Sequence, residues 1–308
     1  MNLLASKNRH TLLKQLAEET FDLVLIGGGI TGAGIALDAV SRGLKVALVE
    51  KQDFAQGTSS RSTKLIHGGL RYLKQGDLKL VKEVGSERAI VHKNAPHLVI
   101  PEKMLLPLIE GGTYGKMATS FGLKVYDVLA GVKGDDRRKM LSKQQTQQKE
   151  PLLNPDTLKG GGYYAEYRTD DARLTMGIIK TANEYGALCA NHCEAIKLLY
   201  NEGGIIGVQV KDHIQDKVME IHAQQVVNAT GPWVDTIRQE DNSLKGKRLH
   251  LTKGVHLVVN HQKFPLKQSL YFDVPDGRMI FAIPRGKITY IGTTDTNYQG
   301  KLEEHQTT

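Results

Sequence analysis

The sequence predicts an α/β fold built from two interleaved domains, one Rossmann-like around a parallel sheet and one α+β around an antiparallel sheet. A strand, a glycine-rich loop, a helix and a second strand follow one another between Leu23 and Glu50, which is the βαβ unit of parallel sheets. Between His256 and Gly292 the chain has successive apolar segments separated by turn residues, the pattern of an antiparallel sheet. The two patterns indicate two kinds of sheet in one chain.

Composition and charge limit the class of protein. The chain has 308 residues, of which 40% are hydrophobic and 24% charged, and this excludes collagen-like repeats, disulfide miniproteins and a wholly disordered chain. A net charge of +8 leaves phosphate groups, acidic substrates, anionic lipid and nucleic acid open as partners. The cysteines are Cys189 and Cys193 alone, and so few fit a reducing compartment.

We expect neither a secretory signal nor a membrane-spanning helix. Residues 1–21 contain basic side chains but no continuous apolar core. No segment reaches the roughly 18 consecutive apolar residues of a spanning helix. These observations predict a cytoplasmic protein.

The first part of the chain alternates helices with strands. Leucines in residues 12–16 are spaced for one face of a short helix. Residues 23–26 form a strand that is apolar on both faces, as a strand inside a parallel sheet is. Residues 35–40 have helical spacing, and residues 45–50 form the second strand.

The middle of the chain changes character. A helix is predicted for residues 74–88, and Pro96, Pro101 and Pro107 follow it, which places a domain crossing near residue 98. Residues 133–149, rich in Lys, Arg and Gln, are expected to form an exposed helix and loop.

The later elements return the chain to the first sheet. Asp170 and Asp171 cap a predicted helix, and alternating segments at 187–227 form a meander of strands. The predicted domains are residues 20–97 with 165–245, the Rossmann-like domain, and residues 98–164 with 246–308, the antiparallel-sheet domain.

The loop after the first strand carries the motif Gly27-x-Gly29-x-x-Gly32. Between a strand and a helix, such glycines make a tight turn, admit a pyrophosphate and let helix and strand pack closely. The phosphates then lie against N–H groups at the positive end of the helix. Glu50 ends the second strand, where a carboxylate accepts hydrogen bonds from an adenosine ribose. The combination predicts a dinucleotide site.

Residues 57–73 favour FAD over NAD as the dinucleotide. A simple NAD domain continues with another strand and helix, whereas this segment is dense in hydroxyl groups and then in glycines. Hydroxyls and backbone amides suit a pyrophosphate and a flavin edge, and Gly68 and Gly69 let the backbone approach a ring system. The alternative is a polar loop that leads into a helix.

Several segments resemble one known family. They are GGGITGAGIALDAVSRG, VEKQDFAQGTSSRSTKLIHGGLRYL, YYAEYRTDDARL, VVNATGPWVD, LTKGVHLVV and IGTTDT, and they occur in the family's order. In them the chain closely resembles the FAD-dependent glycerol-3-phosphate dehydrogenases of the aerobic, quinone-linked type, which have a glycine-oxidase and D-amino-acid-oxidase type of fold. The resemblance implies an FAD-binding domain interleaved with a substrate (cap) domain. Family members continue past Thr308 with a C-terminal remainder that this sequence lacks.

The resemblance implies a reaction and its residues. Non-covalent FAD would accept a hydride at N5 from C2 of sn-glycerol 3-phosphate, giving dihydroxyacetone phosphate, and the electrons would pass to a quinone. In the family's pattern Arg71, Tyr72 and His256 face the substrate. A guanidinium suits a phosphate or a developing alkoxide because it stays charged. An imidazole can take the hydroxyl proton.

The predicted FAD contacts lie in the glycine loop, at the end of the second strand, in the hydroxyl-rich and glycine-rich segment and after the meander. They are Gly27, Gly29, Ile30, Thr31, Gly32, Glu50, Lys51, Thr58, Ser59, Ser60, Lys64, Leu65, His67, Gly68, Gly69, Ala229, Thr230 and Gly231.

Other interpretations and partners stay open. Electrons could pass to oxygen, as in the oxidase branch, or the chain could be a non-catalytic flavin-binding fragment. The basic surplus fits peripheral attachment to the inner face of the cell membrane through anionic lipid, and we expect a homo-oligomer. We expect no nucleic acid partner, because aromatic residues are 6% of the chain and no nucleic-acid motif occurs.

Cys189, His192 and Cys193 are close enough in sequence to be considered as metal ligands. On a single strand, positions 189 and 193 share one face and position 192 points to the other, so the three side chains do not converge. We therefore predict no metal.

Overall fold

The computed structural model describes residues 3–66, 77–112, 115–129, 134, 137–274 and 276–303. Within this part the chain divides into two compact units. Unit 1 comprises the described parts of Met1–Ser62, Asp170–Leu251 and Gln299–Gln306, and unit 2 those of Thr63–Thr169 and Thr252–Tyr298.

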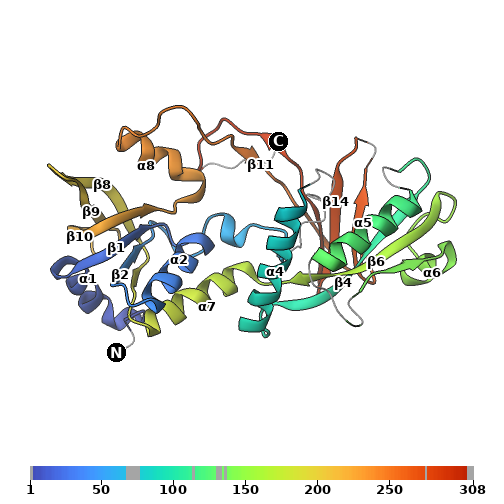
Figure 1. The fold of residues 1–308 in the computed structure, drawn as a ribbon, viewed down its shortest axis with the longest axis horizontal. Coiled ribbons are helices and arrows are strands. Elements are labelled where there is room, and N and C mark those ends of the chain that lie inside the picture. Colours follow the sequence, from blue (N-terminus) through green and yellow to red (C-terminus); the bar gives the residue numbers. More distant parts are fainter. Residues whose placement is uncertain are drawn as a thin grey trace. The chain divides into compact units, whose positions relative to one another are not determined.

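The described residues of unit 1 form a six-stranded sheet with the order β7-β2-β1-β10-β9-β8. Strands β1, β2, β8, β9 and β10 of this sheet are labelled in Figure 1. Strands β7, β2, β1 and β10 run parallel, and β9 and β8 continue the sheet antiparallel. The bounds are Thr20–Ile26 (β1), Val46–Val49 (β2), Leu188–Ala190 (β7), Cys193–Asn201 (β8), Gly204–Asp212 (β9) and Lys217–Asn228 (β10). The predicted βαβ unit forms the centre of this sheet.

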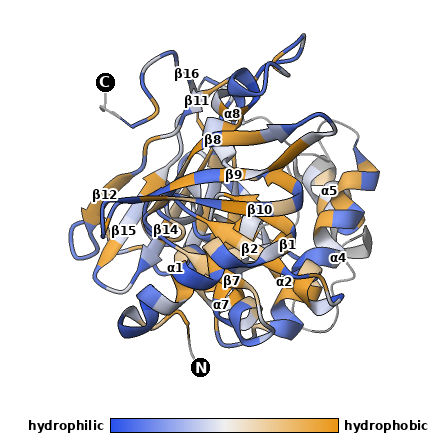
Figure 2. Cartoon of the chain, turned by 90° about the vertical axis from the view of Figure 1, so that its left-hand side faces the viewer, coloured by the Kyte–Doolittle hydropathy of each residue, from blue (hydrophilic) through white to orange (hydrophobic). Residues whose placement is uncertain are grey.

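The two faces of this sheet are covered by different helices. Successive side chains of a strand point to opposite faces, so Val24 packs in a core with α1 while Leu25 packs in a core with α2 and α7. Strands β1, β2 and β7 are accordingly mostly hydrophobic in Figure 2. The helical elements of unit 1 are η1 (Ser6–Asn8), α1 (Arg9–Glu18), α2 (Ile30–Ser41), η2 (Thr58–Ser60), α7 (Asp171–Glu184), η4 (Gly231–Trp233) and α8 (Val234–Glu240).

The start of α7 has the cap that its sequence predicts. A side-chain oxygen of Asp170 accepts a hydrogen bond from the backbone N–H of Arg173 at 3.1 Å. This bond satisfies one of the N–H groups that a helix start leaves without a partner inside the helix. The buried Ile179 and Ala182 of α7 then pack in the core shared with α2.

The described residues of unit 2 form an eight-stranded sheet with the order β12-β15-β14-β13-β4-β6-β3, in which β5 also pairs with β6. All its pairs are antiparallel except that of β13 with β4. The bounds are Leu65–Ile66 (β3), Ile100–Ile109 (β4), Lys139–Leu141 (β5), Leu158–Arg168 (β6), Leu257–Asn260 (β12), Ser269–Asp273 (β13), Met279–Arg285 (β14) and Ile288–Gly292 (β15). Strands β11 (Thr252–Lys253) and β16 (Thr296–Asn297) pair separately.

Helices α4 (Leu78–Asn94) and α5 (Lys116–Leu129) supply apolar residues to the core of unit 2. Val81 of α4 and Leu123 of α5 are buried there with Met104 of β4. The short helix α6 (Lys143–Lys149) begins with a capping box, as the backbone N–H and side chain of its third residue bond the residue before the helix. The predicted exposed segment at 133–149 thus contains β5 and α6.

The first crossing between the units lies at Ser62 and Thr63, so the predicted crossing near residue 98 is wrong. Strand β3 pairs with β6, and Val81 lies in the core of unit 2, so the chain has already left unit 1 there. The prolines misled the prediction, because Pro101 and Pro107 lie inside β4. Strand β13 pairs with β4 only at residues 104–105, so neither proline has to donate a hydrogen bond to it.

Two further boundaries differ from expectation. The chain re-enters unit 1 at Asp170 and leaves it after Leu251, which is within a few residues of the predicted 165 and 245. It then returns to unit 1 at Gln299, whereas residues 246–308 were all expected in the second domain. The return is tied down by Glu303, whose carboxylate pairs with Lys51 at 3.2 Å.

Candidate functional site

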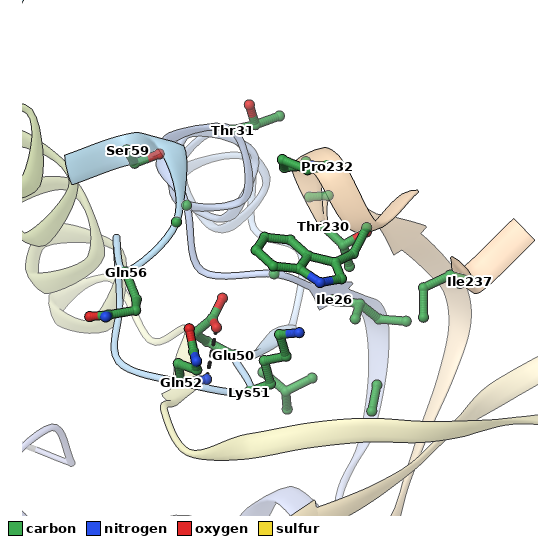
Figure 3. Close-up of a pocket in the computed structure, with 18 of the residues that line it drawn as sticks. Ile26, Thr31, Glu50, Lys51, Gln52, Gln56, Ser59, Thr230, Pro232 and Ile237 are labelled. Carbon is green, nitrogen blue, oxygen red and sulfur yellow. Dashed lines mark hydrogen bonds between the residues drawn. The ribbon is translucent and has the colours of Figure 1, made fainter. Parts of the chain in front are cut away.

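Unit 1 contains a pocket of about 360 Å³ where the parallel strands β1, β2 and β10 end (Figure 3). The carboxyl ends of parallel strands are where α/β sheets bind their ligands. The lining residues are Ile26, Gly27, Gly29, Ile30, Thr31, Val49, Glu50, Lys51, Gln52, Gln56, Gly57, Thr58, Ser59, Cys193, Glu194, Ala195, Ala229, Thr230, Gly231, Pro232, Trp233, Thr236 and Ile237.

The glycine loop forms the floor between β1 and α2. Gly27 has φ +113°, and a Cβ there would lie 2.5 Å from the carbonyl oxygen of Ala229. A Cβ at Gly32 would overlap the carbonyl oxygen of Gly27. Glycine at both positions therefore lets β1, α2 and the end of β10 come together.

Glu50 directly follows β2 and is held by two backbone groups. Its carboxylate accepts a hydrogen bond from the N–H of Gly28 at 2.7 Å. It accepts another from the N–H of Gln52 at 2.8 Å, drawn as a dashed line in Figure 3. These bonds fix the carboxylate at the edge of the pocket. A carboxylate has lone pairs for about four hydrogen bonds, so it can still accept from the two hydroxyls of a ribose.

The start of α2 bonds an oxygen from outside the helix. The N–H of Ile30 donates to the hydroxyl of Ser59 at 2.9 Å. Ser59 belongs to η2, whose hydroxyl groups the sequence placed beside a phosphate. The N-terminus of a helix favours negative charge, and a pyrophosphate is an acceptor of this kind.

Lys51 and Trp233 form another part of the wall, and the carboxylate of Glu303, which is outside the lining, bonds both of them. The Lys51 ammonium lies 4.2 Å from the centre of the Trp233 ring, and the indole N–H of Trp233 donates to Glu303 at 2.6 Å. The Trp233 hydrogen bond and the Lys51 charge lower the pKa of Glu303. The three side chains support one another next to the glycine loop.

Most of the predicted FAD contacts that belong to unit 1 line this pocket. Gly32 does not line it but packs under the loop against Gly27, and the Ser60 hydroxyl instead donates to the carbonyl of Gly57 at 3.3 Å. The predicted residues that do line it are Gly27, Gly29, Ile30, Thr31, Glu50, Lys51, Thr58, Ser59, Ala229, Thr230 and Gly231.

The other predicted residues lie elsewhere in the chain. Lys64 and Leu65 belong to unit 2, where Leu65 begins β3. His67, Gly68, Gly69, Arg71 and Tyr72 lie outside the described residues.

The sequence analysis missed part of the lining. Pro232 and Trp233 immediately follow the predicted Gly231, so the motif that contains them was already a signal. Glu194 and Ala195 come from the start of β8, an antiparallel strand, and no motif marks them. Their contribution depends on tertiary structure alone.

His256, the predicted base, lies in unit 2 just before β12. Its Nε2 lies 3.4 Å from the hydroxyl of Thr63, and its ring meets the Tyr290 ring edge-on at a centroid distance of 5.9 Å. Burial, together with the positive charge of Lys64, lowers the pKa of His256 from its ordinary value of 6.5. Both effects favour the neutral imidazole, which is the form able to accept a proton.

Cys189 and Cys193 do not share a strand, which corrects the geometry assumed above. Cys189 lies in β7 and Cys193 begins β8, and His192 between them has φ +52°. Both thiols are buried and free, and burial raises the pKa of Cys189 to about 12 and that of Cys193 to about 11. Thiols of this kind are unreactive as nucleophiles at neutral pH.

Among the helices of the described residues, none has both the length and the apolar character needed to cross a bilayer.

The fold and the pocket define a dinucleotide-binding flavoprotein class. The family model described as FAD dependent oxidoreductase (DAO) matches residues 22–308. The chain therefore belongs to this family, whose cofactor is FAD, and the glycine loop, Glu50 and the start of α2 fit such a dinucleotide.

Two relatives are identical to this chain at more than half of the aligned positions. The chain is 58% identical over 304 residues to the aerobic glycerol-3-phosphate dehydrogenase of Bacillus subtilis (strain 168), covering 99% of this chain and 55% of that protein. It is 58% identical over 297 residues to the protein of the same name from Staphylococcus aureus (strain USA300), covering 96% and 53%. The chain thus spans about half the length of these relatives.

Solved structures agree on the fold. The glycerol-3-phosphate dehydrogenase of Bacillus halodurans, complexed with FAD, superposes with a TM-score of 0.82 at 48% identity, covering 98% of this chain and 53% of that one. The glycine oxidase of Bacillus cereus ATCC 14579 superposes with a TM-score of 0.62 at 19% identity, covering 91% and 73%. The expected glycine-oxidase type of fold is confirmed.

Proposed function

We propose that this chain is part of an FAD-dependent dehydrogenase that oxidises sn-glycerol 3-phosphate to dihydroxyacetone phosphate and passes the electrons to a quinone. The observation that carries the proposal is the 58% identity over 304 residues to an aerobic glycerol-3-phosphate dehydrogenase. The pocket of unit 1 supports it, because its backbone and its one strand-end carboxylate suit a dinucleotide.

The residues of unit 1 would hold FAD. The N–H groups at the start of α2 would face the pyrophosphate, and Glu50 would accept hydrogen bonds from the adenosine ribose. Lys51 and Trp233 would close the pocket beside them. Bound FAD supplies a two-electron acceptor for the hydride that leaves C2 of the substrate.

His256 would act as the general base. The C2 hydroxyl loses its proton to the imidazole while the C2 hydrogen leaves as hydride, so the carbon becomes the ketone carbon of dihydroxyacetone phosphate. Lowering the pKa of His256 favours this role, since the neutral imidazole is the form that accepts a proton.

Arg71 and Tyr72 would bind the substrate. They belong to the GGLRYL segment that resembles the family's substrate side, and they lie outside the described residues. A guanidinium offers a planar pair of donors to a phosphate, and a phenol can donate to a phosphate oxygen.

The proposal includes a peripheral location on the inner face of the cell membrane and self-association. The net charge of +8 supports attraction to anionic lipid, where a membrane quinone would take the electrons. Vesicles with anionic lipid should retain the chain at low salt and release it at high salt. Retention that does not depend on salt would contradict an electrostatic attachment.

The test of the reaction is the visible absorption of the purified chain with FAD, recorded without oxygen before and after sn-glycerol 3-phosphate is added. We expect the flavin bands to bleach, and glycerol to leave them unchanged. A quinone should restore the bands faster than oxygen does. Flavin bands that never bleach with the phosphate would contradict oxidation by this chain.

A further inference from the structure

Residues from two other segments of unit 2, Thr63 and strand β15, lie against the His256 ring. The Thr63 hydroxyl lies 3.4 Å from Nε2, the Tyr290 ring lies edge-on to the imidazole, and Gly292 leaves no space on the third side. A Cβ at Gly292 would lie 2.5 Å from the imidazole Cδ2. The imidazole therefore has one polar partner among these contacts, the Thr63 hydroxyl.

Tyr290 holds Thr63, the residue whose hydroxyl contacts the imidazole. Its hydroxyl donates to the backbone carbonyl of Thr63 at 2.7 Å. Tyr290 lies in β15, paired with Ile283 of β14 on one side and with Val258 of β12 on the other, so its position is set by the sheet. A hydrogen bond from a side chain fixed in this way restricts where Thr63 can lie.

Arg285, the last residue of β14 in the same sheet, holds Lys64, which follows Thr63 in the chain. Its Nη2 donates to the carbonyl of Lys64 at 3.2 Å and to the carbonyl of Thr169 at 2.7 Å. The N–H of Thr169 also donates to the Lys64 carbonyl, at 2.9 Å. Lys64 has φ +55°, a left-handed conformation that a side-chain-bearing residue adopts only when its surroundings impose it.

The segment 63–64 therefore brings two different groups to His256. Thr63 supplies the hydroxyl at Nε2, and Lys64 supplies the positive charge that, after burial, lowers the pKa of the imidazole. The other titratable side chain against the ring in the described residues is Tyr290, whose hydroxyl is turned to the Thr63 carbonyl. Both groups depend on the same short piece of backbone.

We propose that Tyr290 and Arg285 are positioning residues, which hold the segment 63–64 so that the Thr63 hydroxyl fixes the rotation and the tautomer of the His256 imidazole. The importance of this arrangement for catalysis rests on the function proposed above, whereas the arrangement itself does not. A hydroxyl can donate to Nε2 or accept from it, so it selects one tautomer only when its own position is held constant. A base also needs its other ring nitrogen in a constant place.

The test is the nitrogen NMR spectrum of His256 in the purified chain, with His256→Ala used to assign the signal. We expect one tautomer in the wild type. In Tyr290→Phe, which removes the hydroxyl and keeps the ring, we expect a mixture of tautomers and a higher pKa of His256. Arg285→Met should change the signal in the same direction, and Arg285→Lys should restore part of it because one donor remains.

Tyr200→Phe is the matched control. It also removes one tyrosine hydroxyl that is hydrogen-bonded at 2.7 Å, but the partner is Asp241 in unit 1. The His256 signal should stay unchanged in this variant. If Tyr290→Phe does not fold, as judged by circular dichroism, Thr63→Val removes the hydroxyl at Nε2 itself and so tests the contact that Tyr290 is proposed to hold in place.

Turnover gives the second measurement. In Tyr290→Phe, kcat should fall about 10-fold with an unchanged KM, because the base is misaligned and substrate binding is not. A wild-type tautomer and pKa in Tyr290→Phe and Thr63→Val would overturn the positioning proposal. An altered tautomer with unchanged turnover would support the positioning and overturn the role of His256 in the proposed function.

Discussion

Unit 1 and unit 2 present their functional groups in different ways. The pocket of unit 1 relies on backbone at its glycine loop, with glycines where no side chain fits and one carboxylate held by two N–H groups. The described site of unit 2 depends on the His256 side chain, whose surroundings come from Thr63, Tyr290 and Gly292. Binding groups made of backbone follow from short local motifs, whereas a reacting side chain depends on distant segments.

Substitutions in the two units should therefore have effects of different size. A change that places atoms inside the backbone pocket should prevent binding altogether, because the backbone cannot move away. A change beside a reacting side chain should alter rate or protonation and leave binding intact.

The largest effect is expected for Gly32→Val. Any Cβ here overlaps the Gly27 carbonyl, so the glycine loop and α2 must separate and FAD binding should be lost. Fluorescence titration with FAD measures this, and Gly34→Ala, where a Cβ meets nothing within 4 Å, is the control. A Gly32→Val chain that binds FAD as tightly as the wild type would contradict the role of the glycine loop in FAD binding.

A large effect on stability is expected for Arg9→Met. Arg9 of α1 pairs with Asp212, whose side chain is 1% exposed, so the variant leaves a buried carboxylate without its cation. Burial raises the pKa of Asp212, but the Arg9 hydrogen bond and the N–H groups of Ile214 and Gln215 outweigh it and lower the pKa overall. The free energy of unfolding should fall by about 3 kcal/mol.

Urea unfolding followed by circular dichroism measures the loss at Arg9. Because the pKa of Asp212 is lowered in the folded chain, its contribution should be present above the ordinary value of 3.8 and should disappear as the pH falls below it. Asp212→Asn in the Arg9→Met background should recover part of the stability. Lys14→Met, which removes an exposed partner of Glu18, is the control and should change little.

A moderate effect is expected for Glu50→Gln. The amide keeps the size of the side chain but weakens the hydrogen bonds from a ribose, so the Kd for FAD should rise about 10-fold. Glu194→Gln is the matched control, since Glu194 also lines the pocket but pairs with His213 at 2.8 Å. Equal effects of the two variants would show that Glu50 has no special place in the pocket.

The smallest effect is a shift along the pH axis. The lowered pKa of His256 places the acid limb of kcat/KM below pH 6.5. Stability should rise with pH across the interval between the folded pKa and 6.5, because the unfolded chain binds more protons there. Lys64→Gln removes the nearby charge and should move the limb upward. If the acid limb of kcat/KM does not move in Lys64→Gln, burial alone lowers the pKa of His256.

The sequence predicts unit 1 well because its signals are local. The motif from Gly27 to Gly32, the apolar strand before it and Glu50 after the next strand lie within one βαβ unit, and the structure forms that unit. The capping Asp170 likewise acts on the next turn of chain. Such features need no knowledge of the rest of the fold.

Unit 2 is predicted less well because its elements break local rules. Strand β4 contains two prolines, and β6 contains Gly160, Gly161 and Gly162, so neither was expected as a strand. The glycines are explained by packing, since a Cβ at Gly162 would lie 2.7 Å from the Leu123 side chain of α5. Contacts between segments far apart in sequence override propensity here.

The residues around His256 show the same limit. The histidine itself was identified by its resemblance to a family motif, and Thr63 lies in the hydroxyl-rich segment, but nothing in the sequence connects Thr63, Tyr290 or Arg285 to His256. They act through the register of β14 with β15 and through the bend at Lys64. Only the three-dimensional structure brings them together.

The most direct test of the division between binding and chemistry is anaerobic stopped-flow reduction of the flavin in His256→Ala. With FAD bound to the same extent as in the wild type, sn-glycerol 3-phosphate should bleach the variant's flavin about 100-fold or more slowly, as expected when a general base is removed. A variant that holds its full flavin content and is reduced at the wild-type rate would contradict the assignment of the chemistry to His256.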